Sequence, residues 1–189
     1  PNVVSREEEL ALKAIQTTYQ VDDRYNAVTH SFLQSCVEIF REAPVTLLRE
    51  HYRCHPKIIE FCNQRFYNGE LVAMTTDEGE KDVLQVIRTV PGNHARGHFN
   101  QREIDVITQE VLPECAESGR IGIITPYRAQ AEAINKTVGK DIASTVHKYQ
   151  GRECDTIIMS MVDNYPTEFS DDANLLNVAI SRAKTKLCL

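Results

Sequence analysis

The sequence has little of several features that define particular classes of protein. It contains no tryptophan, and none of its apolar runs approaches the roughly 18 to 20 residues that a bilayer-spanning helix needs. Its six cysteines form no C-x-x-C pair, and a chain of 189 residues can bury a core without disulfides, so reduced thiols are the better interpretation. The first residues are acidic, unlike a basic leader before an apolar segment. We expect an intracellular protein, cytoplasmic or nuclear, that makes no membrane contact.

An excess of positive charge is also missing. The 21 lysines and arginines face 27 aspartates and glutamates, which gives a formal net charge of -6 and a pI near 5.5. This balance argues against a uniformly basic nucleic-acid coat but is compatible with a local groove. With 42% hydrophobic and 25% charged residues, the composition is that of one ordinary globular domain.

Two catalytic motifs are absent. The spacing that comes nearest to a phosphate loop, Gly92 to Gly97, is followed by His98 and Phe99 where a lysine and a serine or threonine are required. We interpret it as a flexible turn and expect no ATP hydrolysis by this chain alone. The chain also lacks a G-x-S-x-G nucleophile elbow, which argues against a hydrolase triad.

Apolar spacing predicts helices and strands that alternate along the chain. Helices are expected over residues 5–16, 30–42, 56–67, 100–119, 126–138 and 175–184. Strands are expected over residues 45–48, 83–90, 121–124, 141–147 and 155–162, with a further strand beginning at 184–189. Strands that are apolar on both faces and alternate with helices predict a mostly parallel sheet covered on both sides, an α/β three-layer sandwich with right-handed crossovers.

The two ends of the chain suggest a piece of a longer protein. Pro1 begins the chain without a methionine, and the final apolar segment stops as a strand begins. We predict that residues 1–44 form a connecting segment packed on the domain, and that residues 45–189 form the domain itself.

Four stretches of this domain combine an arginine, an aromatic or hydroxyl side chain, and a proline or glycine. They read REHYRCHP, TPYRAQ, HKYQGRECD and NVAISRAK. Ligands of open α/β sheets collect at the carboxyl ends of the strands, so we expect the first three stretches to follow strands and the fourth to lie on the last helix.

In this order the four stretches resemble the second RecA-like motor domain of superfamily 1 helicases, in the AAA-domain branch that includes the nonsense-mediated-decay helicase. The resemblance runs from about Leu47 to the end of the chain; LLREHYRCHPKIIEFCNQRFYNGEL is similar to the Q-Y-R-M-H-P stretch of that family and the helix after it. His51 and Cys54 depart from the usual glutamine and methionine, which puts the shape of an adenine pocket in doubt.

The resemblance implies the C-terminal motor domain of an ATP-dependent DNA or RNA helicase. ATP and Mg²⁺ would be held mainly by a first RecA-like domain that this chain lacks. That domain and single-stranded nucleic acid, DNA or RNA, would be the partners.

Two arginines are the implied catalytic residues. Phosphoryl transfer needs positive charge fixed around the departing γ-phosphate, and guanidinium groups supply it with planar donors. The resemblance makes Arg53 the contact to the γ-phosphate and Arg182 the arginine finger. The alternative for Arg53 is a surface ion pair, for instance with Glu50.

Four further residues are implied in nucleotide binding. Tyr52 would stack on the adenine; the alternative is a core aromatic at a strand end. Gln150 and Gly151 precede Glu153, which would accept a hydrogen bond from a ribose hydroxyl or help to order the phosphate site. Gly151 would let the backbone approach a ligand closely. The alternative for this segment is a tight turn with solvated charges.

Five residues are implied in binding single-stranded nucleic acid. Thr125, Pro126 and Tyr127 lie where a strand ends and a helix begins, and free N–H groups at a helix start suit a phosphate. Thr145 and His147 match family positions that face the strand. Thr125 has the alternative of a plain helix cap, and His147 that of a hydrogen-bonded polar group under a loop.

No metal site is predicted. His51, Cys54, His55 and Cys62 are zinc-binding residue types, but Pro56 and the change from strand to helix make a common face doubtful. Two rival functions stay open at this point. One is a non-enzymatic nucleic-acid-binding or protein-docking module with the same fold; the other is a different α/β enzyme, which would be active as the isolated chain.

Overall fold

The computed structural model describes residues 4–92, 94–167 and 172–189. The chain divides into two compact units, Pro1–Leu48 and Arg49–Leu189, and each is described by itself. The domain boundary expected after residue 44, and the packing of the first segment on the domain, stay predictions.

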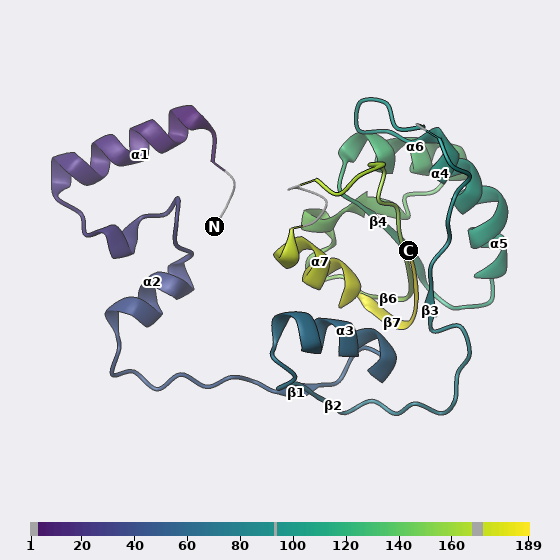
Figure 1. The fold of residues 1–189 in the computed structure, drawn as a ribbon, viewed down its shortest axis with the longest axis horizontal. Coiled ribbons are helices and arrows are strands. Elements are labelled where there is room, and N and C mark those ends of the chain that lie inside the picture. The colour runs from purple at the N-terminus through teal and green to yellow at the C-terminus, as the bar shows by residue number, and fades with distance from the viewer. Residues whose placement is uncertain (1–3, 93, 168–171) are drawn as a thin grey trace. The chain divides into compact units, whose positions relative to one another are not determined.

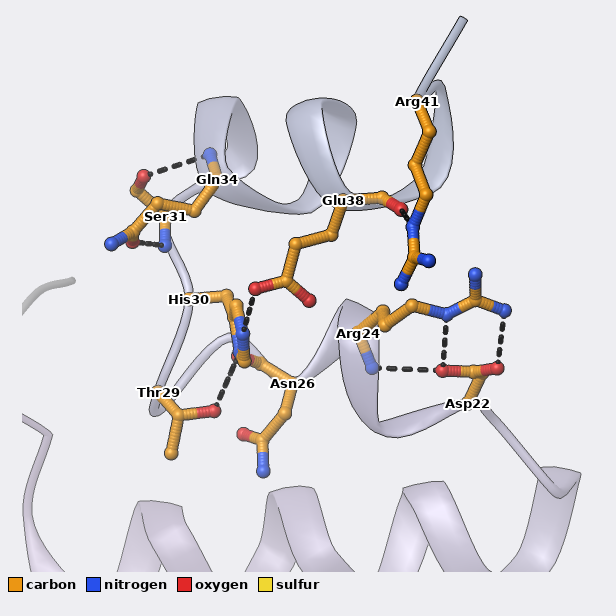
Figure 2. Close-up of polar contacts among 9 residues, drawn as sticks. All are labelled: Asp22, Arg24, Asn26, Thr29, His30, Ser31, Gln34, Glu38 and Arg41. Carbon is orange, nitrogen blue, oxygen red and sulfur yellow. Dashed lines mark hydrogen bonds and ion pairs between the residues drawn. The ribbon is translucent and has the colours of Figure 1, made fainter.

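The first unit contains two capped helices, both expected from the sequence. Helix α1 spans Arg6–Tyr19 and helix α2 spans Phe32–Ile39, with a short 3-10 turn, η1, at Asp23–Tyr25 between them. Each helix begins with a capping box, in which a serine and the residue three positions later exchange hydrogen bonds between side chain and backbone. Figure 2 shows the box of α2, where the Ser31 amide donates to Gln34 Oε1 at 2.7 Å.

Polar contacts, more than apolar packing, hold the first unit together. Asp22 forms a two-pronged ion pair with Arg24, and His30 Nε2 lies 3.1 Å from a carboxylate oxygen of Glu38 (Figure 2). The hydrogen bonds from Arg24 hold the pKa of Asp22 well below its usual range. Among the described residues of this unit, Ser35 alone is buried. The predicted strand at 45–48 is wrong, because these exposed residues join no ladder and pairing begins only at Glu50.

The second unit is built on a five-stranded parallel sheet, which confirms the predicted sheet type. Its strands lie in the order β3-β7-β6-β4-β5, and every neighbouring pair is parallel. Their bounds are β3 Leu84–Gln85, β4 Ile121–Thr125, β5 Ala143–Thr145, β6 Cys154–Met159 and β7 Ala183–Cys188. A separate parallel pair joins β1, Glu50–His51, to β2, Val72–Ala73. Strand β3 is shorter than the predicted 83–90 and covers Leu84–Gln85, although the Ile87 amide still donates to the Leu189 carbonyl.

The helices of the second unit follow the predicted order. They are α3 Pro56–Phe66, α4 Gln101–Val106, a π-helical turn η2 Ile107–Val111, α5 Leu112–Glu114, α6 Arg128–Val138, a 3-10 turn η3 Val146–Tyr149 and α7 Ala173–Ile180. Asn100 caps α4 as expected. The π turn ends two residues before Pro113, whose ring would clash with the carbonyl four residues earlier in a regular α-helix. Helix α6 begins two residues later than predicted, because Tyr127 has an extended backbone.

Two apolar cores, one on each face of the sheet, make the three-layer sandwich that the alternating pattern predicts. Ile124 and Ile157 pack in the core beneath α3 and α7, whereas their neighbours Ile123 and Ile158 pack in the core beneath α4 and α6. Figure 1 shows α3 and α7 on the opposite side of the strands from α4 and α5. Successive side chains of a strand point to opposite faces, so strands covered on both faces are apolar at most positions.

Gly122 of β4 is the tightest point of the sheet. A β-carbon at this position would lie 1.7 Å from Tyr149 Oη and 2.9 Å from Cys154 Sγ. We expect Gly122→Ala to lower the free energy of unfolding by about 1–3 kcal/mol, as overpacked cores do. Denaturant unfolding would measure this loss. The added change Tyr149→Phe, which removes the nearest atom, should recover part of it; a fully additive double mutant would contradict the clash.

Candidate functional site

An open hollow at one edge of the second unit collects several of the predicted residues. It is lined by Glu50, His51, Tyr52, Arg53, Glu153 and Lys184. The first four come from β1 and the loop after it, Glu153 directly precedes β6, and Lys184 lies at the start of β7. A backbone hydrogen bond from His55 to the carbonyl of Lys184, 2.7 Å long, holds the loop against β7.

The Glu153 carboxylate bridges two cations in this hollow. Arg53 Nε donates to Glu153 Oε2 at 2.8 Å, and Lys184 Nζ lies 2.6 Å from Glu153 Oε1. A further bond runs from an Arg53 Nη to the carbonyl of Ser181 at 3.3 Å. Arg53 therefore forms a partly exposed ion pair, as the alternative expected, but its acidic partner is Glu153 and not Glu50.

Arg182 lies beside this cluster in the turn between α7 and β7. Its placement on the last helix is a wrong prediction, because α7 ends at Ile180 and the Arg182 carbonyl already accepts from the Cys154 amide of the neighbouring strand. Arg182 Nε donates to the Val178 carbonyl at 3.0 Å. Burial lowers the pKa of Arg182, and the nearby Arg53 lowers it further. Two neighbouring guanidinium groups repel each other, and an anion bound beside them relieves this repulsion.

In the five-stranded sheet, the hollow lies at the amino ends of β6 and β7, not at the carboxyl ends that we expected; only Tyr52 and Arg53 follow the end of a strand, β1. Glu153 comes directly before β6 and Arg182 directly before β7, and Cys154 pairs with Ala183 in the parallel ladder. Equivalent ends of parallel strands meet at one edge of a sheet, so this register brings Glu153 beside the residues that start β7. The strand predicted over 141–147 is too long, because β5 ends at Thr145 and residues 146–149 form the 3-10 turn η3.

The predicted adenine and ribose residues are placed differently from one another. Tyr52 is 67% exposed and its hydroxyl donates to the Glu50 carboxylate, so the core-aromatic alternative is wrong. Gln150 and Gly151 are exposed in the turn after η3, where Gly151 has a φ of 80°. These two do not line the described hollow, whereas Glu153, two residues further on, does.

The predicted nucleic-acid residues lie at the opposite edge of the sheet, where β4 and β5 end. Thr125 and Thr145 are direct partners in the parallel ladder. Thr125 is 1% exposed, and the N-cap of α6 is Tyr127, so the cap alternative for Thr125 is wrong. Pro126 lines a small apolar hollow together with Thr125. His147 is exposed in η3, which contradicts the alternative of a group covered by a loop.

Tyr127 is the best-fixed of these residues. Its hydroxyl donates to Asp163 Oδ2 at 2.7 Å, and its ring centroid lies 4.2 Å from that of His98. Burial raises the pKa of the Tyr127 hydroxyl, and the hydrogen bond to Asp163 raises it further. An aromatic ring held rigidly at a helix start, next to an imidazole, is a suitable surface for stacking a base.

The four zinc-type residues do not gather into a ligand set among the described residues. His51 Nε2 accepts from the Cys54 amide at 3.0 Å, which occupies the lone pair that a metal would need. Burial raises the pKa of Cys54 to about 11 and that of Cys62 to about 12. Zinc binds thiolates, and such pKa values oppose their formation.

A second group of metal-type residues, His55, Asp77 and Glu80, has another explanation. His55 caps α3, because its Nδ1 accepts from the Lys57 amide at 3.1 Å. Because Nδ1 accepts, Nε2 carries a proton, and it faces Glu80 at 3.3 Å and Asp77 at 3.5 Å. Lys57 Nζ already supplies a cation 3.0 Å from Asp77. The geometry is that of a helix cap tied to a loop by ion pairs.

Sequence reasoning missed Lys184 and the polar group around Glu103. Lys184 lies within the NVAISRAK stretch, so a lysine two residues after the implied arginine finger was a visible signal. The Glu103 carboxylate accepts hydrogen bonds from Ser160 and from the Val162 amide, 57 and 59 residues away in sequence. Nothing in the local pattern indicates such a contact.

Comparisons with known proteins agree with this geometry. A parallel sheet with helices on both faces is the architecture expected of a RecA-like α/β domain, and other α/β folds share it. A family model described as an AAA domain matches residues 28–189, and the chain belongs to this family of superfamily 1 helicases.

Curated relatives of the chain are named as helicases. The chain is 30% identical over 165 residues to "5'-3' DNA helicase ZGRF1" of Mus musculus, covering 76% of this chain and 9% of the relative. It is 30% identical over 174 residues to "Helicase sen1" of Schizosaccharomyces pombe, covering 76% of this chain and 10% of the relative. The C-terminal domain of a possible DNA helicase from Lactobacillus plantarum aligns with a TM-score of 0.48 and 18% identity, over 73% of this chain and 85% of that one. The chain thus spans about a tenth of the length of the two curated relatives.

Within the described ranges, no helix combines the length and the apolar character needed to cross a bilayer.

The bridged carboxylate should be visible in titration. Hydrogen bonds from Lys184, and next from Arg53, hold the pKa of Glu153 below its usual range. A lowered folded pKa means that the pair stabilises the fold above the ordinary pKa of glutamate and loses this contribution as the pH falls through the folded value. Carboxyl NMR should show Lys184→Met raising the pKa of Glu153 more than Arg53→Met does. Lys186→Met on the same strand is the control, and an equal rise in that variant would contradict the bridge.

Proposed function

We propose that this chain is the C-terminal, second RecA-like motor domain of an ATP-dependent superfamily 1 helicase. The observation that carries the proposal is the cluster of Arg53, Arg182 and Lys184 around the Glu153 carboxylate. Family membership and relatives named as helicases support it. Residues 45–189 would form the motor domain and residues 1–44 the connecting segment, in a protein of the cytoplasm or nucleus.

The residues of the hollow suit a nucleoside triphosphate bound mainly by a first motor domain. Arg53 and Lys184 line the hollow and Arg182 lies beside it, so three cationic groups are available to a polyphosphate. Arg53 would contact the γ-phosphate, and Arg182 would act as the arginine finger that stabilises charge as the phosphoryl group departs. The exposed ring of Tyr52 would stack on the adenine, with Gln150, Gly151 and Glu153 toward the ribose and phosphates. Mg²⁺ would neutralise phosphate charge from the partner domain.

Arg53 must change partners for this role. Its Nε faces Glu153 in the structure, and the ion pair is half exposed, so solvent weakens it and a phosphate can compete for the guanidinium. Lys184 keeps Glu153 paired when Arg53 turns to a nucleotide, which avoids an uncompensated carboxylate beside the phosphates. Closure of the two motor domains on ATP would thus draw on groups that are already charged and oriented.

The edge at the ends of β4 and β5 would bind single-stranded DNA or RNA. Tyr127 would stack a base, Thr145 and His147 would contact the strand, and Thr125 and Pro126 would shape the backbone beneath it. Nucleotide and nucleic acid would then lie at opposite edges of one sheet. A motor needs this separation, since each ligand must distinguish the open from the closed state.

The arginine assignment predicts a loss of turnover in the full-length protein. Arg182→Ala should lower the single-strand-stimulated kcat for ATP by about 10³-fold or more, because the finger acts on transition-state charge. Nucleotide binding should change little. Arg128→Ala, which removes only an exposed pair with Glu132, is the matched control. Normal turnover in Arg182→Ala would refute the finger.

A second prediction separates the helicase from its rivals. The isolated 189-residue chain should show no ATPase activity, whereas the full-length protein should show activity stimulated by single strands. Coupled-enzyme phosphate release measures both. Turnover by the purified chain alone would favour a different α/β enzyme. An inactive full-length protein with an intact phosphate loop would favour the non-enzymatic binding module.

A further inference from the structure

Val162, just beyond the end of β6, occupies a strained backbone conformation. Its φ is 68°, in the left-handed region that β-branched residues very rarely adopt, and its side chain is fully buried. The Asp163 amide donates to the Met161 carbonyl at 2.8 Å, which closes a three-residue γ-turn around Val162. A residue in such a conformation persists only where its surroundings overdetermine it, and such residues cluster at functional sites.

Glu103 supplies the strongest of these constraints. Both of its carboxylate oxygens accept from the Val162 amide, at 2.9 and 3.1 Å, and one also accepts from Ser160 Oγ at 2.6 Å. Asn100 Nδ2 donates to the Val162 carbonyl at 3.0 Å. Gln130, fully buried in α6, donates to Ser160 Oγ at 2.8 Å. Hydrogen bonds from polar groups of α4, its N-cap and α6 thus hold the turn and the adjacent Ser160 in place.

The turn fixes the position of Asp163. The Asp163 carboxylate accepts from the hydroxyl of Tyr127, the N-cap of α6, and the Tyr127 ring packs at a tilt of 38° against the His98 ring. Asn100, Glu103 and Asp163 also line one open hollow at this carboxyl edge of the sheet. A continuous series of contacts therefore runs from Glu103 through the strained turn to the Tyr127 ring.

We propose that Glu103 is a positioning residue for the nucleic-acid edge: it holds the Val162 turn in its strained form and thereby fixes Asp163 and the ring of Tyr127 for stacking on a single-stranded base. This rests on the proposed function, because Tyr127 belongs to the edge assigned there. A merely structural turn would be served equally well by glycine or by a relaxed backbone. The strained valine instead makes the orientation of Asp163 depend on the Glu103 carboxylate.

The test uses three variants of the 189-residue chain. Glu103→Ala releases the Val162 amide, so the turn should relax. Adding Val162→Gly to that variant makes the left-handed conformation accessible without the carboxylate. Val162→Gly alone keeps the turn but loses a buried side chain. Glu132→Ala, which removes a carboxylate from an exposed helical ion pair, is the matched control.

Three measurements are made on each variant: NMR contacts between the Tyr127 and His98 rings, the affinity for fluorescein-labelled oligothymidylate and oligouridylate, and the thermal midpoint. Glu103→Ala should lose the ring contact and weaken oligonucleotide binding by about tenfold, a typical size for coupled neighbours. The double variant should recover both, although its thermal midpoint falls further because a buried valine is lost. Affinity and stability should therefore move in opposite directions.

Two outcomes overturn the proposal. One is that affinity follows the thermal midpoint through all variants; the other is that the double variant keeps the disrupted ring contact of Glu103→Ala. Should Glu103→Ala fail to fold, Glu103→Gln takes its place in both comparisons, because it replaces the charged acceptor of the Val162 amide with a weaker, neutral one. Tyr127→Leu separates the two proposals. If the unaltered chain and Tyr127→Leu bind oligonucleotides equally, the nucleic-acid function fails, while the ring contact still tests Glu103.

Discussion

Parallel pairing of β6 with both β4 and β7 is the constraint on which the rest of the second unit depends. Parallel strands in the middle of a sheet are buried on both faces, so two separate cores and two helical layers follow from it. The same register aligns the residues before β6 with those before β7, and the residues after β4 with those after β5. Two chemically different edges arise from one hydrogen-bonded ladder.

The two edges differ in how they treat charge. At the amino edge, a single glutamate is shared between an arginine and a lysine. At the carboxyl edge, the Glu103 carboxylate is satisfied by hydroxyl and amide donors of the neighbouring turn. The first arrangement is ready to exchange a carboxylate for another anion. The second uses a carboxylate to hold backbone in place, and hydrogen bonds to a charged acceptor are strong enough for this purpose.

Much of the fold could be predicted from the sequence, because the signals are local. Apolar runs bounded by glycine and proline indicated the strands of the sheet, and Asn100 three residues before Glu103 indicated the start of α4. The errors occurred where pairing between distant segments decides the secondary structure. Residues 45–48 have a strand-like pattern but no neighbouring strand to pair with. Arg182 lies outside the helix, and its carbonyl accepts a hydrogen bond from the Cys154 amide of β6. The site residues Arg53, Tyr52 and Glu153 were found through motifs, whereas their mutual contacts and the amino-edge location depend on register. Lys184 and Glu103 act through partners distant in sequence, which no periodicity reports.

The thiols of the second unit have a consequence for how the molecule can be probed. Cys54, Cys62, Cys115, Cys154 and Cys188 are all buried, and burial raises the pKa of Cys54, Cys62 and Cys188 to about 11 or 12. Only the thiolate reacts with alkylating reagents. These sulfurs therefore react when the packed layers open, as protected amides exchange, and the rate of their modification measures the opening of the core. Cys54 and Cys188 lie near opposite ends of this unit's sequence. Equal labelling rates at the two sites would therefore indicate that the whole sandwich opens cooperatively.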